Sequence, residues 1–253
     1  MRSVGISMLM ETRIDIALTE RKLCQSRSRA KLLITEGRVL LNHKVCTKPS
    51  VLVSDEDILE LEDLPFVGRG GLKLEGALQQ FPVSLNGRIC LDIGASTGGF
   101  TDCMLKHGAE LVYAVDVGHD QLAESLKNHA QVVNMENTDI RNLHPENFRK
   151  TPDFCSIDVS FISLKYVLPS AFVLLANQAE CIALVKPQFE AGKKALNKQG
   201  VVKSEKIRKQ VLAEMLEFAG QIGFQVLDFC ESPIQGGTGN VEYLIYLRKQ
   251  VVS

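Results

Sequence analysis

Short apolar runs alternate with stretches of helical periodicity from Arg88 to the end of the chain. Such alternation is typical of a doubly wound α/β sheet, in which helices cover both faces of mostly parallel strands. With 253 residues and 45% hydrophobic residues, the chain can bury a core of this kind and still form one small additional domain. The runs that predict strands are Ile89–Ile93, Leu111–Asp116, Gln131–Asn134, Phe154–Asp158, Cys181–Lys186 and Gly239–Leu247.

A glycine-rich turn follows the first of these runs. After Ile93 the chain continues as Gly-Ala-Ser-Thr-Gly-Gly-Phe, and a helix is predicted from Thr101 to His107. A strand, a glycine turn and a helix N-terminus in this order can bind a nucleotide. Because Ser96 replaces the second glycine of the dinucleotide fingerprint, the loop instead resembles the S-adenosylmethionine loop of methyltransferases. The cofactor-binding residues expected here are Asp92, Gly94, Ala95, Ser96, Gly98, Gly99 and Phe100.

Two acidic residues extend this pattern. Asp116 ends the second run, 22 residues after Gly94 and just before Val117, where a carboxylate can accept hydrogen bonds from both hydroxyls of a ribose. Asp139 follows the third run and is expected to accept a hydrogen bond from an adenine amino group. Each acid alone fits a loop or capping residue equally well. Together with the glycine turn they favour a nucleoside cofactor, and spacing alone leaves NAD as the alternative.

Charged residues stand where other runs end or begin. Asp158 and Lys186 end two strands, Glu242 lies in the last run, and Lys73 falls in the first turn of a helix predicted from Leu72 to Phe81. Ligands of open α/β sheets bind at the carboxyl ends of the strands, so Asp158 and Lys186 are expected at a ligand site. Asp158 and Val117 are also expected to bind the cofactor. For Lys73, a solvent-facing position is the alternative.

The residues at these positions also narrow the range of groups that could accept a methyl group. Methylation of carbon 5 of cytosine usually needs a cysteine that follows Pro or Thr, and none of the seven cysteines does. Methylation of an exocyclic amine usually needs two prolines, which Asp158-Val159-Ser160-Phe161 lacks, and Phe161 fits a core aromatic equally well. A ribose hydroxyl fits better, because a lysine held near carboxylates can orient or accept its proton.

The first 62 residues predict a small α+β domain that is basic on one side. Two short helices, the second opened by Ser26 and ended by Gly37, precede short strands that include a hairpin at Asn42-His43. Between Arg21 and Lys48 there are eight basic residues and one acidic residue, which favours an anionic partner, although a solvated helix face would look the same. The expected RNA-binding residues are Arg13, Arg27, Arg29, Lys31, Arg38 and Lys44, with Arg69 in the segment that follows.

The chain therefore divides into residues 1–62, a glycine-rich linker at 63–71 and a catalytic domain at 72–253. The cysteines are dispersed without any CxxC pair, so neither a zinc site nor a disulfide framework is expected, and a reducing cytoplasm is the natural compartment. The first ten residues lack the pattern of a secretory signal, and no run approaches the roughly 20 apolar residues that span a bilayer.

Several long motifs, taken together, resemble the TlyA haemolysin-like family of ribosomal RNA methyltransferases, whose catalytic domain is of the FtsJ type. They are Arg69–Leu74, Asp92–Gly99, Ala114–Gly118, Asp158–Leu164, Leu184–Glu190 and Ser232–Glu242. The first 62 residues resemble an RNA-binding module of ribosomal proteins and pseudouridine synthases, in Arg-Ile-Asp, Ser-Arg-Ser-Arg-Ala-Lys and Glu-Gly-Arg-Val. The resemblance implies a seven-stranded, mostly parallel sheet, S-adenosylmethionine as cofactor and 2′-O-methylation of cytidine in ribosomal RNA. It also implies a catalytic tetrad of Lys73, Asp158, Lys186 and Glu242.

Two alternatives of other classes stay open. An RNA-binding adaptor with an inactive methyltransferase fold would be favoured by loss of a tetrad residue, and none is lost. A membrane-active haemolysin would need a long apolar or strongly amphipathic segment, which the sequence does not contain.

Overall fold

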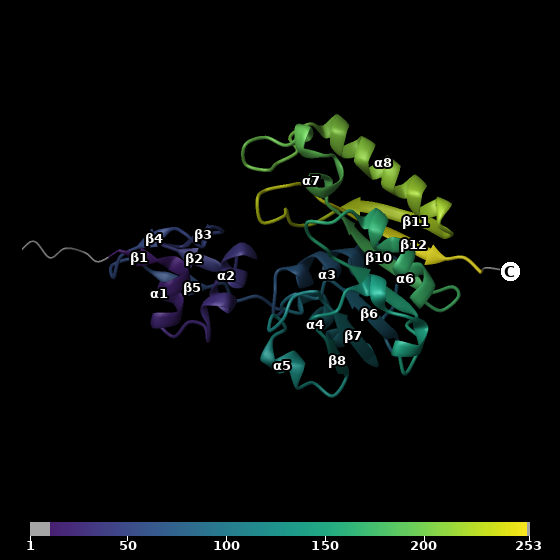
Figure 1. The fold of residues 1–253 in the computed structure, drawn as a ribbon, viewed down its shortest axis with the longest axis horizontal. Helices are drawn as coiled ribbons and strands as arrows, with labels where there is room; N and C mark the ends of the chain where they lie inside the picture. The colour runs from purple at the N-terminus through teal and green to yellow at the C-terminus, as the bar shows by residue number, and fades with distance from the viewer. Residues whose placement is uncertain (1–10, 252–253) are drawn as a thin grey trace, which may run out of the picture. The chain divides into compact units, whose positions relative to one another are not determined.

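The computed structural model describes residues 11–251. The chain divides into two compact units, Met1–Leu64 and Pro65–Ser253, each with its own apolar core. Figure 1 shows the first unit in purple and blue and the second in colours from blue to yellow.

The first unit combines two helices with short antiparallel strands. Strands β2, β3 and β5 form one sheet in the order β3-β2-β5, and β1 pairs with β4. Ile14, Leu18, Ile34 and Val39 are fully buried between the helices and these strands. The elements are β1 (Thr12–Arg13), α1 (Ile14–Glu20), α2 (Arg27–Thr35), β2 (Val39–Leu41), β3 (Lys44–Cys46), β4 (Leu52–Val53) and β5 (Leu59–Leu61).

Local capping explains where these elements begin and end. The Oγ of Ser26 accepts a hydrogen bond from the amide of Arg29 at 3.2 Å, as an N-cap residue does. Gly37 follows α2 at a φ of 71°, and Asn42 and His43 take φ values of 49° and 63° between β2 and β3. Two left-handed residues in a two-residue turn match the twist of a hairpin. The helices and hairpin expected from the sequence are confirmed.

The second unit contains a seven-stranded sheet in the order β11-β12-β10-β9-β6-β7-β8. Strand β12 runs antiparallel to β10 and β11, and the other pairs are parallel, which confirms the expected mostly parallel sheet. The strands are β6 (Ile89–Ile93), β7 (Leu111–Val115), β8 (Val132–Met135), β9 (Phe154–Ile157), β10 (Glu180–Val185), β11 (Phe224–Glu231) and β12 (Tyr243–Lys249). The helices are α3 (Gly70–Gln80), α4 (Gly99–Lys106), α5 (Glu124–Lys127), α6 (Leu168–Leu174), α7 (Pro187–Glu190) and α8 (Glu205–Gln221), with 3₁₀ turns η1 (Ile140–Asn142), η2 (Pro145–Asn147), η3 (Leu164–Tyr166) and η4 (Lys193–Ala195).

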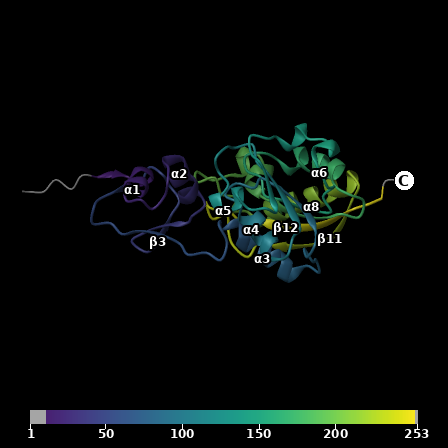
Figure 2. The same cartoon turned by 90° about the horizontal axis from the view of Figure 1, so that it is seen from below.

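Helices cover both faces of this sheet, as alternation of side chains along the strands requires. Cys90 on β6 packs into the core beneath α3 and α4, whereas its neighbour Leu91 packs into the core beneath α6 and α8. Figure 2 shows α6 on one side of the unit and α3 on the other. The strands are buried on both faces, which explains their nearly continuous apolar sequences.

The order of the strands reverses at β6, because β7 lies on one side of it and β9 on the other. Ligands of doubly wound sheets bind at such a reversal, at the carboxyl ends of the strands. Helix α3 begins at Gly70, two residues before the expected start. A Cβ on Gly71 would lie 2.4 Å from Cγ of Phe66, so glycine is needed there for close packing. Gly71 therefore belongs to the helix and not to a flexible linker.

Candidate active site at the carboxyl end of the sheet

The glycine turn after β6 lies at the reversal of strand order. Gly94 and Gly98 have φ values of 83° and 94°, and Ser96 also lies in the left-handed region at 50°. A Cβ on Gly94 would lie 2.4 Å from the backbone oxygen of Asp158, the residue that follows β9. The turn therefore needs glycine both for its conformation and for contact with the end of the neighbouring strand.

Asp92 supports this turn from inside the protein. Its carboxylate is fully buried and accepts hydrogen bonds from Oγ1 of Thr101 at 2.7 Å and Oγ of Ser156 at 3.0 Å. Burial raises the pKa of Asp92 to about 7, although the two hydroxyl donors act in the opposite direction. Thr101 lies on α4 and Ser156 on β9, so the expected cofactor residue Asp92 joins three elements beneath the turn.

The two other expected cofactor acids follow β7 and β8. Asp116 accepts hydrogen bonds from the amides of Ser96 at 2.8 Å and Gly118 at 2.7 Å, so it is attached directly to the glycine turn. Asp139 caps η1 and forms an ion pair with Arg141 at 2.6 Å. Hydrogen bonds from Arg141 lower the pKa of Asp139, which keeps this carboxylate charged. Val117, between Asp116 and Gly118, is 73% exposed.

Ala95, Gly99 and Phe100, the remaining residues expected at the cofactor, are buried. A Cβ on Gly99 would lie 2.8 Å from the amide nitrogen of Gly71, so α3 and α4 are in close contact at their N-termini. This contact brings the helix that carries Lys73 next to the glycine turn.

The four side chains of the expected tetrad come together in one connected cluster. Lys73 Nζ lies 2.7 Å from Glu242 Oε2 and 3.9 Å from Asp158 Oδ2. Lys186 Nζ lies 2.5 Å from Asp158 Oδ1. Asp158 thus bridges two lysines that are far apart in the sequence.

The topology of the sheet explains this convergence. Asp158 and Lys186 directly follow β9 and β10, which are adjacent and parallel, so both leave the same edge of the sheet. Glu242 directly precedes β12, which pairs antiparallel with β10 and begins opposite its end, with Tyr243 aligned to Val185. Lys73 reaches the same edge from the first turn of α3.

Burial makes the charges in this cluster depend on one another. Lys73 and Lys186 are each 8% exposed and Glu242 is 2% exposed. Burial acts to lower the pKa of Lys73, but the charges of Asp158 and Glu242 outweigh it and raise this pKa. Burial likewise acts to raise the pKa of Asp158, but Lys186 and Lys73 hold it below the ordinary value. Lys73 and Asp158 are therefore charged at neutral pH.

Three further residues belong to the cluster and were not assigned a role from the sequence. Lys186 Nζ donates to Ser160 Oγ at 2.9 Å, and Gln188 Nε2 donates to Glu242 Oε1 at 2.9 Å. Oδ1 of Asp158 is buried and lies 2.5 Å from Lys186 Nζ. Oε1 of Gln188 is buried too and accepts no hydrogen bond within residues 11–251. Such an acceptor is uncommon in folded proteins and marks a place where a donor from a substrate fits.

The third residue is Phe161, three positions after Asp158. It is 91% exposed, which excludes the core position that the sequence left open. Its φ of 64° is rare for a bulky side chain, and its ring lies 5.1 Å from that of Phe189. Strained backbone of this kind occurs at functional sites, because folded proteins otherwise avoid it.

The basic residues expected to bind RNA differ in how they are held. Arg13 and Arg27 both form ion pairs with the buried Asp15, at 3.0 Å and 2.9 Å, so part of their charge supports the fold. Arg38 donates to the backbone oxygen of Glu62 at 3.0 Å. Lys31 and Lys44 are exposed and Arg29 is half-buried. Arg69 precedes α3 in the second unit.

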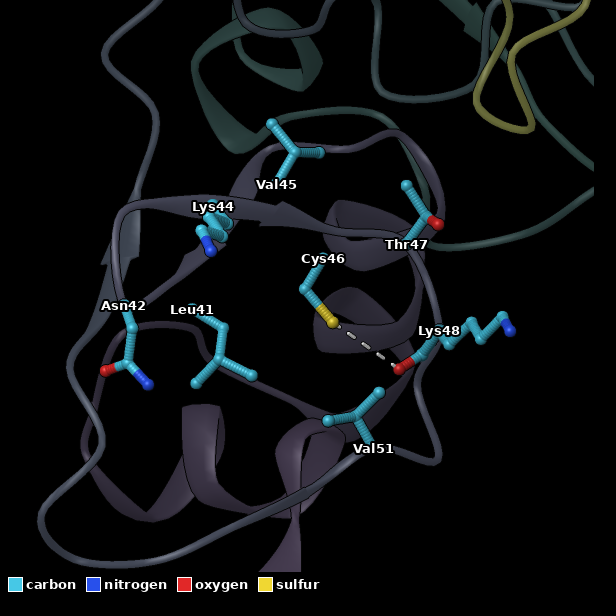
Figure 3. Close-up of a pocket in the computed structure, with 8 residues that line it drawn as sticks. All are labelled: Leu41, Asn42, Lys44, Val45, Cys46, Thr47, Lys48 and Val51. Carbon is cyan, nitrogen blue, oxygen red and sulfur yellow. Dashed lines mark hydrogen bonds between the residues drawn. The ribbon is translucent and has the colours of Figure 1, made fainter.

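The first unit also has a shallow hollow beside β3 (Figure 3). Leu41, Cys46 and Val51 line it with apolar surface, and the ammonium group of Lys48 points away from it. It contains no converging set of charged groups, so it lacks the chemistry of a catalytic site. The tetrad, which belongs to the second unit, is the stronger candidate.

One further group of potential metal ligands lies between α3 and α4. His107 Nε2 is 2.6 Å from Glu75 Oε2, and Cys103 Sγ is 3.8 Å from the same oxygen. Burial raises the pKa of the Cys103 thiol well above its ordinary value, which disfavours the thiolate that a metal would need. This group could not be predicted from the sequence, because Glu75 is 28 residues from Cys103 and 32 from His107.

Comparison with known proteins agrees with this architecture. Residues 66–249 match the FtsJ-like methyltransferase family, and residues 12–59 match the S4 domain. The chain is 46% identical over 238 residues to YqxC of Bacillus subtilis, covering 93% of this chain and 85% of that protein. It is 41% identical over 246 residues to the 16S/23S rRNA (cytidine-2′-O)-methyltransferase TlyA of Mycobacterium tuberculosis, covering 96% of this chain and 92% of the relative.

A solved structure is similar over nearly the whole chain. The protein of Streptococcus thermophilus described as a hemolysin is 43% identical, with a TM-score of 0.76, and the match covers 96% of this chain and 90% of that one. The matched family spans most of the chain, and both sequence relatives align over most of their own length. The chain therefore belongs to the FtsJ-like methyltransferase family, in the group that includes TlyA and carries an S4 domain at its N-terminal end.

Proposed function

We propose that this chain transfers a methyl group from S-adenosylmethionine to the 2′-hydroxyl of a cytidine in ribosomal RNA. The observation that carries the proposal is the buried cluster of Lys73, Asp158, Lys186 and Glu242 at the carboxyl end of the sheet, beside the glycine turn. The TlyA relative is named for this activity, and its similarity over nearly the whole chain supports the same acceptor here.

The residues around the glycine turn fit the cofactor. Gly94 and Gly98 hold the backbone in a left-handed conformation that brings the turn against the end of β9. Each carboxylate oxygen of Asp116 accepts one amide hydrogen bond and retains a lone pair for a ribose hydroxyl. Asp139 would accept a hydrogen bond from the adenine amino group. When bound, S-adenosylmethionine supplies an electrophilic methyl group on a sulfonium centre.

Lys186 and Asp158 would hold the reacting hydroxyl. The ammonium group of Lys186 has three hydrogens, of which one is donated to Ser160 Oγ and one faces Asp158. The third can be donated to the 2′ oxygen, while the hydroxyl proton points to Oδ1 of Asp158, which accepts from Lys186 and retains a second lone pair. Fixing the direction of a weak nucleophile in this way can supply several kcal/mol of the rate enhancement.

Lys73 and Glu242 would keep this arrangement in place. The charges of Asp158 and Glu242 raise the pKa of Lys73 above its ordinary value, so Lys73 serves as a counter-charge at neutral pH and not as a base. It holds Glu242 at 2.7 Å and faces Oδ2 of Asp158 at 3.9 Å. With two ammonium groups and two carboxylates, the cluster is neutral overall, which limits the cost of burying it.

Phe161 would provide a surface for the base of the target nucleotide. An exposed aromatic ring close in sequence to Asp158 can stack on a base that has left its helix, and enzymes that modify nucleotides commonly hold them in this way. Residues 1–62, with the exposed Lys31 and Lys44, would bind RNA phosphates outside the catalytic unit.

The test is methyl transfer to naked ribosomal RNA and to each ribosomal subunit with tritium-labelled S-adenosylmethionine, followed by mapping of the modified riboses. The wild-type protein should label a cytidine 2′-hydroxyl. Lys186→Ala should bind the cofactor normally in calorimetry and lose transfer by at least about 100-fold. Lys150→Ala is the matched control, because Lys150 lies before β9 at the opposite end of the strand.

Label on a base in place of a ribose, or full activity in Lys186→Ala, would contradict the proposal. The haemolysin alternative makes a different prediction, namely release of dye from lipid vesicles without any RNA substrate. Across the described residues, 11–251, no helix is both long enough and apolar enough to cross a membrane.

A further inference from the structure

The segment between α7 and α8, residues 191–204, contains four lysines and no acidic residue. Lys193, Lys194, Lys198 and Lys203 are all exposed. Within the part of the chain that the structure describes, none of the four ammonium groups forms a hydrogen bond or ion pair. Most other surface lysines of this unit do, as Lys106, Lys150 and Lys209 each lie against an acid.

This segment is held in a defined conformation by Asn240. The side chain of Asn240 is 1% exposed, accepts a hydrogen bond from the amide of Val202 at 3.0 Å and donates to the backbone oxygen of Gly200 at 3.0 Å. Val202 is itself buried, so the segment has an apolar anchor beside this polar one. Within the segment, Asn197 Oδ1 accepts the amides of Gln199 and Val201, each at 2.9 Å.

Both ends of the segment are joined to stretches of chain that also carry tetrad residues. Its first residue follows α7, which begins directly after Lys186 and contains Gln188, the donor to Glu242. Its last turn is fastened to Asn240, two residues before Glu242. Figure 1 shows the green segment between α7 and α8 and the yellow one between β11 and β12 at the same end of the unit. The four lysines are therefore carried by a loop that is held between the residues following Lys186 and the residue two positions before Glu242.

We propose that residues 191–204 form a phosphate strap, a loop that binds the RNA backbone beside the nucleotide to be methylated. We further propose that Asn240 is the positioning residue that fixes the strap relative to Glu242. The inference rests on the proposed function, and it adds a substrate-binding surface within the catalytic unit.

The chemistry of the strap fits a nucleic-acid backbone better than a protein surface. Lysine is a flexible point charge that pairs with phosphate without selecting a base, and the strap contains no aromatic residue for stacking. The strap would hold the strand near the tetrad while Phe161 engages the base. An acidic protein is the other possible partner and is an outcome of the test below.

The lysines are tested with K193A/K194A/K198A against K106A/K150A/K209A, which removes the same charge from surface lysines outside the strap. Binding of a ribosomal RNA fragment is measured with saturating S-adenosylhomocysteine from 0.1 to 1 M salt. Loss of three phosphate contacts should reduce the magnitude of the slope of log K against log salt by about 2. The variant should therefore bind RNA tens of fold more weakly than wild type near 0.15 M salt and with nearly the same affinity at 1 M. The control should keep the wild-type slope, and both variants should bind S-adenosylhomocysteine normally.

Asn240→Ala tests the positioning role, with Asn147→Ala as the control, because Asn147 also fastens a backbone turn through its side chain. Asn240→Ala should raise KM for RNA and leave cofactor affinity unchanged. When Asn240→Ala is combined with the lysine substitutions, it should weaken RNA binding little further, since both changes act through the same contact. A full additive loss would show that Asn240 does not act through the strap.

The outcomes separate this inference from the proposed function. If the wild-type protein methylates no ribose in ribosomal RNA, the proposed function fails. If it does methylate RNA and the strap variant binds RNA with the wild-type affinity and salt slope, the strap proposal fails alone. Loss of binding to an acidic protein without any change in RNA binding would also refute it.

Discussion

Replacing Lys73 by Met should destabilise the second unit strongly, because it leaves a carboxylate buried without its counter-charge. Glu242 is 2% exposed, and among residues 11–251 its carboxylate keeps only the side-chain amide of Gln188 as a donor once Nζ of Lys73 is removed. Methionine has a similar length, so little packing is lost. Breaking a buried ion pair by removing one partner costs about 3–5 kcal/mol. We expect Lys73→Met to lower the free energy of unfolding by this amount at pH 7.

The companion variant K73M/E242Q should be more stable than Lys73→Met, although it carries one more substitution. Glutamine keeps an oxygen that accepts the hydrogen bond from Gln188 and removes the unpaired charge. It leaves one amide N–H without its partner, which costs about 1–3 kcal/mol. The double variant should therefore regain about 2 kcal/mol of the loss, and neither variant should transfer methyl groups.

Urea unfolding followed by tyrosine fluorescence measures this effect in the right part of the chain. The protein has no tryptophan, and its four tyrosines, Tyr113, Tyr166, Tyr243 and Tyr246, all lie in the second unit. Unfolding of the first unit therefore does not contribute to the signal directly. A loss below about 1 kcal/mol for Lys73→Met, or a double variant no more stable than the single one, would refute the view that this pair is a buried, mutually dependent ion pair.

Substitutions at three other residues test the site. Burial raises the pKa of Asp92 to about 7, whereas the carboxyl group of an unfolded chain titrates near 4. The contribution of Asp92 to wild-type stability therefore falls as pH rises through this window, by roughly 4 kcal/mol at most. Asp92→Asn should gain stability relative to wild type between pH 4 and 7 in parallel urea titrations, and a difference that stays constant with pH would contradict this. Phe161→Gly should relieve the strain of the left-handed backbone at this position, so the free energy of unfolding should stay unchanged or rise. It should nevertheless lower kcat/KM for RNA by about 5- to 150-fold, because the stacking surface is lost. Phe161→Tyr should keep activity. Gly94→Ala should lose cofactor affinity in calorimetry because its Cβ meets the oxygen of Asp158 at 2.4 Å, and Gly87→Ala, with a φ of 72° and no atom within 4 Å, should lose none.

The sequence predicted the fold well where a local pattern and a physical requirement coincide. The run of glycines after Ile93 indicated a turn, and φ values of 83° and 94° at Gly94 and Gly98 show why glycine is required there. Asp158 and Lys186 could be placed together because parallel strands bring their carboxyl ends to one edge. Glu242 could not be placed in this way, since it precedes an antiparallel strand and strand direction is not visible in the residues. Family resemblance supplied that position.

Contacts between distant residues account for what the sequence did not predict. Lys73 and Glu242 are 169 residues apart, so no local pattern reports whether the lysine faces solvent or a carboxylate. Arg13 and Arg27 resemble other surface arginines, and only the fold shows that both pair with the buried Asp15. Helix α3 was expected to begin at Leu72, after a glycine-rich linker, but it begins at Gly70, where close packing against Phe66 and α4 requires glycine at Gly71 and Gly99.

Asp158 is the residue on which the two halves of the candidate site depend. Its side chain contacts both lysines, and its backbone oxygen lies against Gly94, where a Cβ would not fit. A change in the glycine turn therefore displaces the same residue that fixes Lys73 and Lys186, and loss of the lysines leaves a buried carboxylate behind the turn. The geometry implies that a change in the glycine turn also disturbs the orientation of the acceptor hydroxyl. The position of Asp158 after β9, at the reversal of strand order, is what makes that coupling a consequence of the fold.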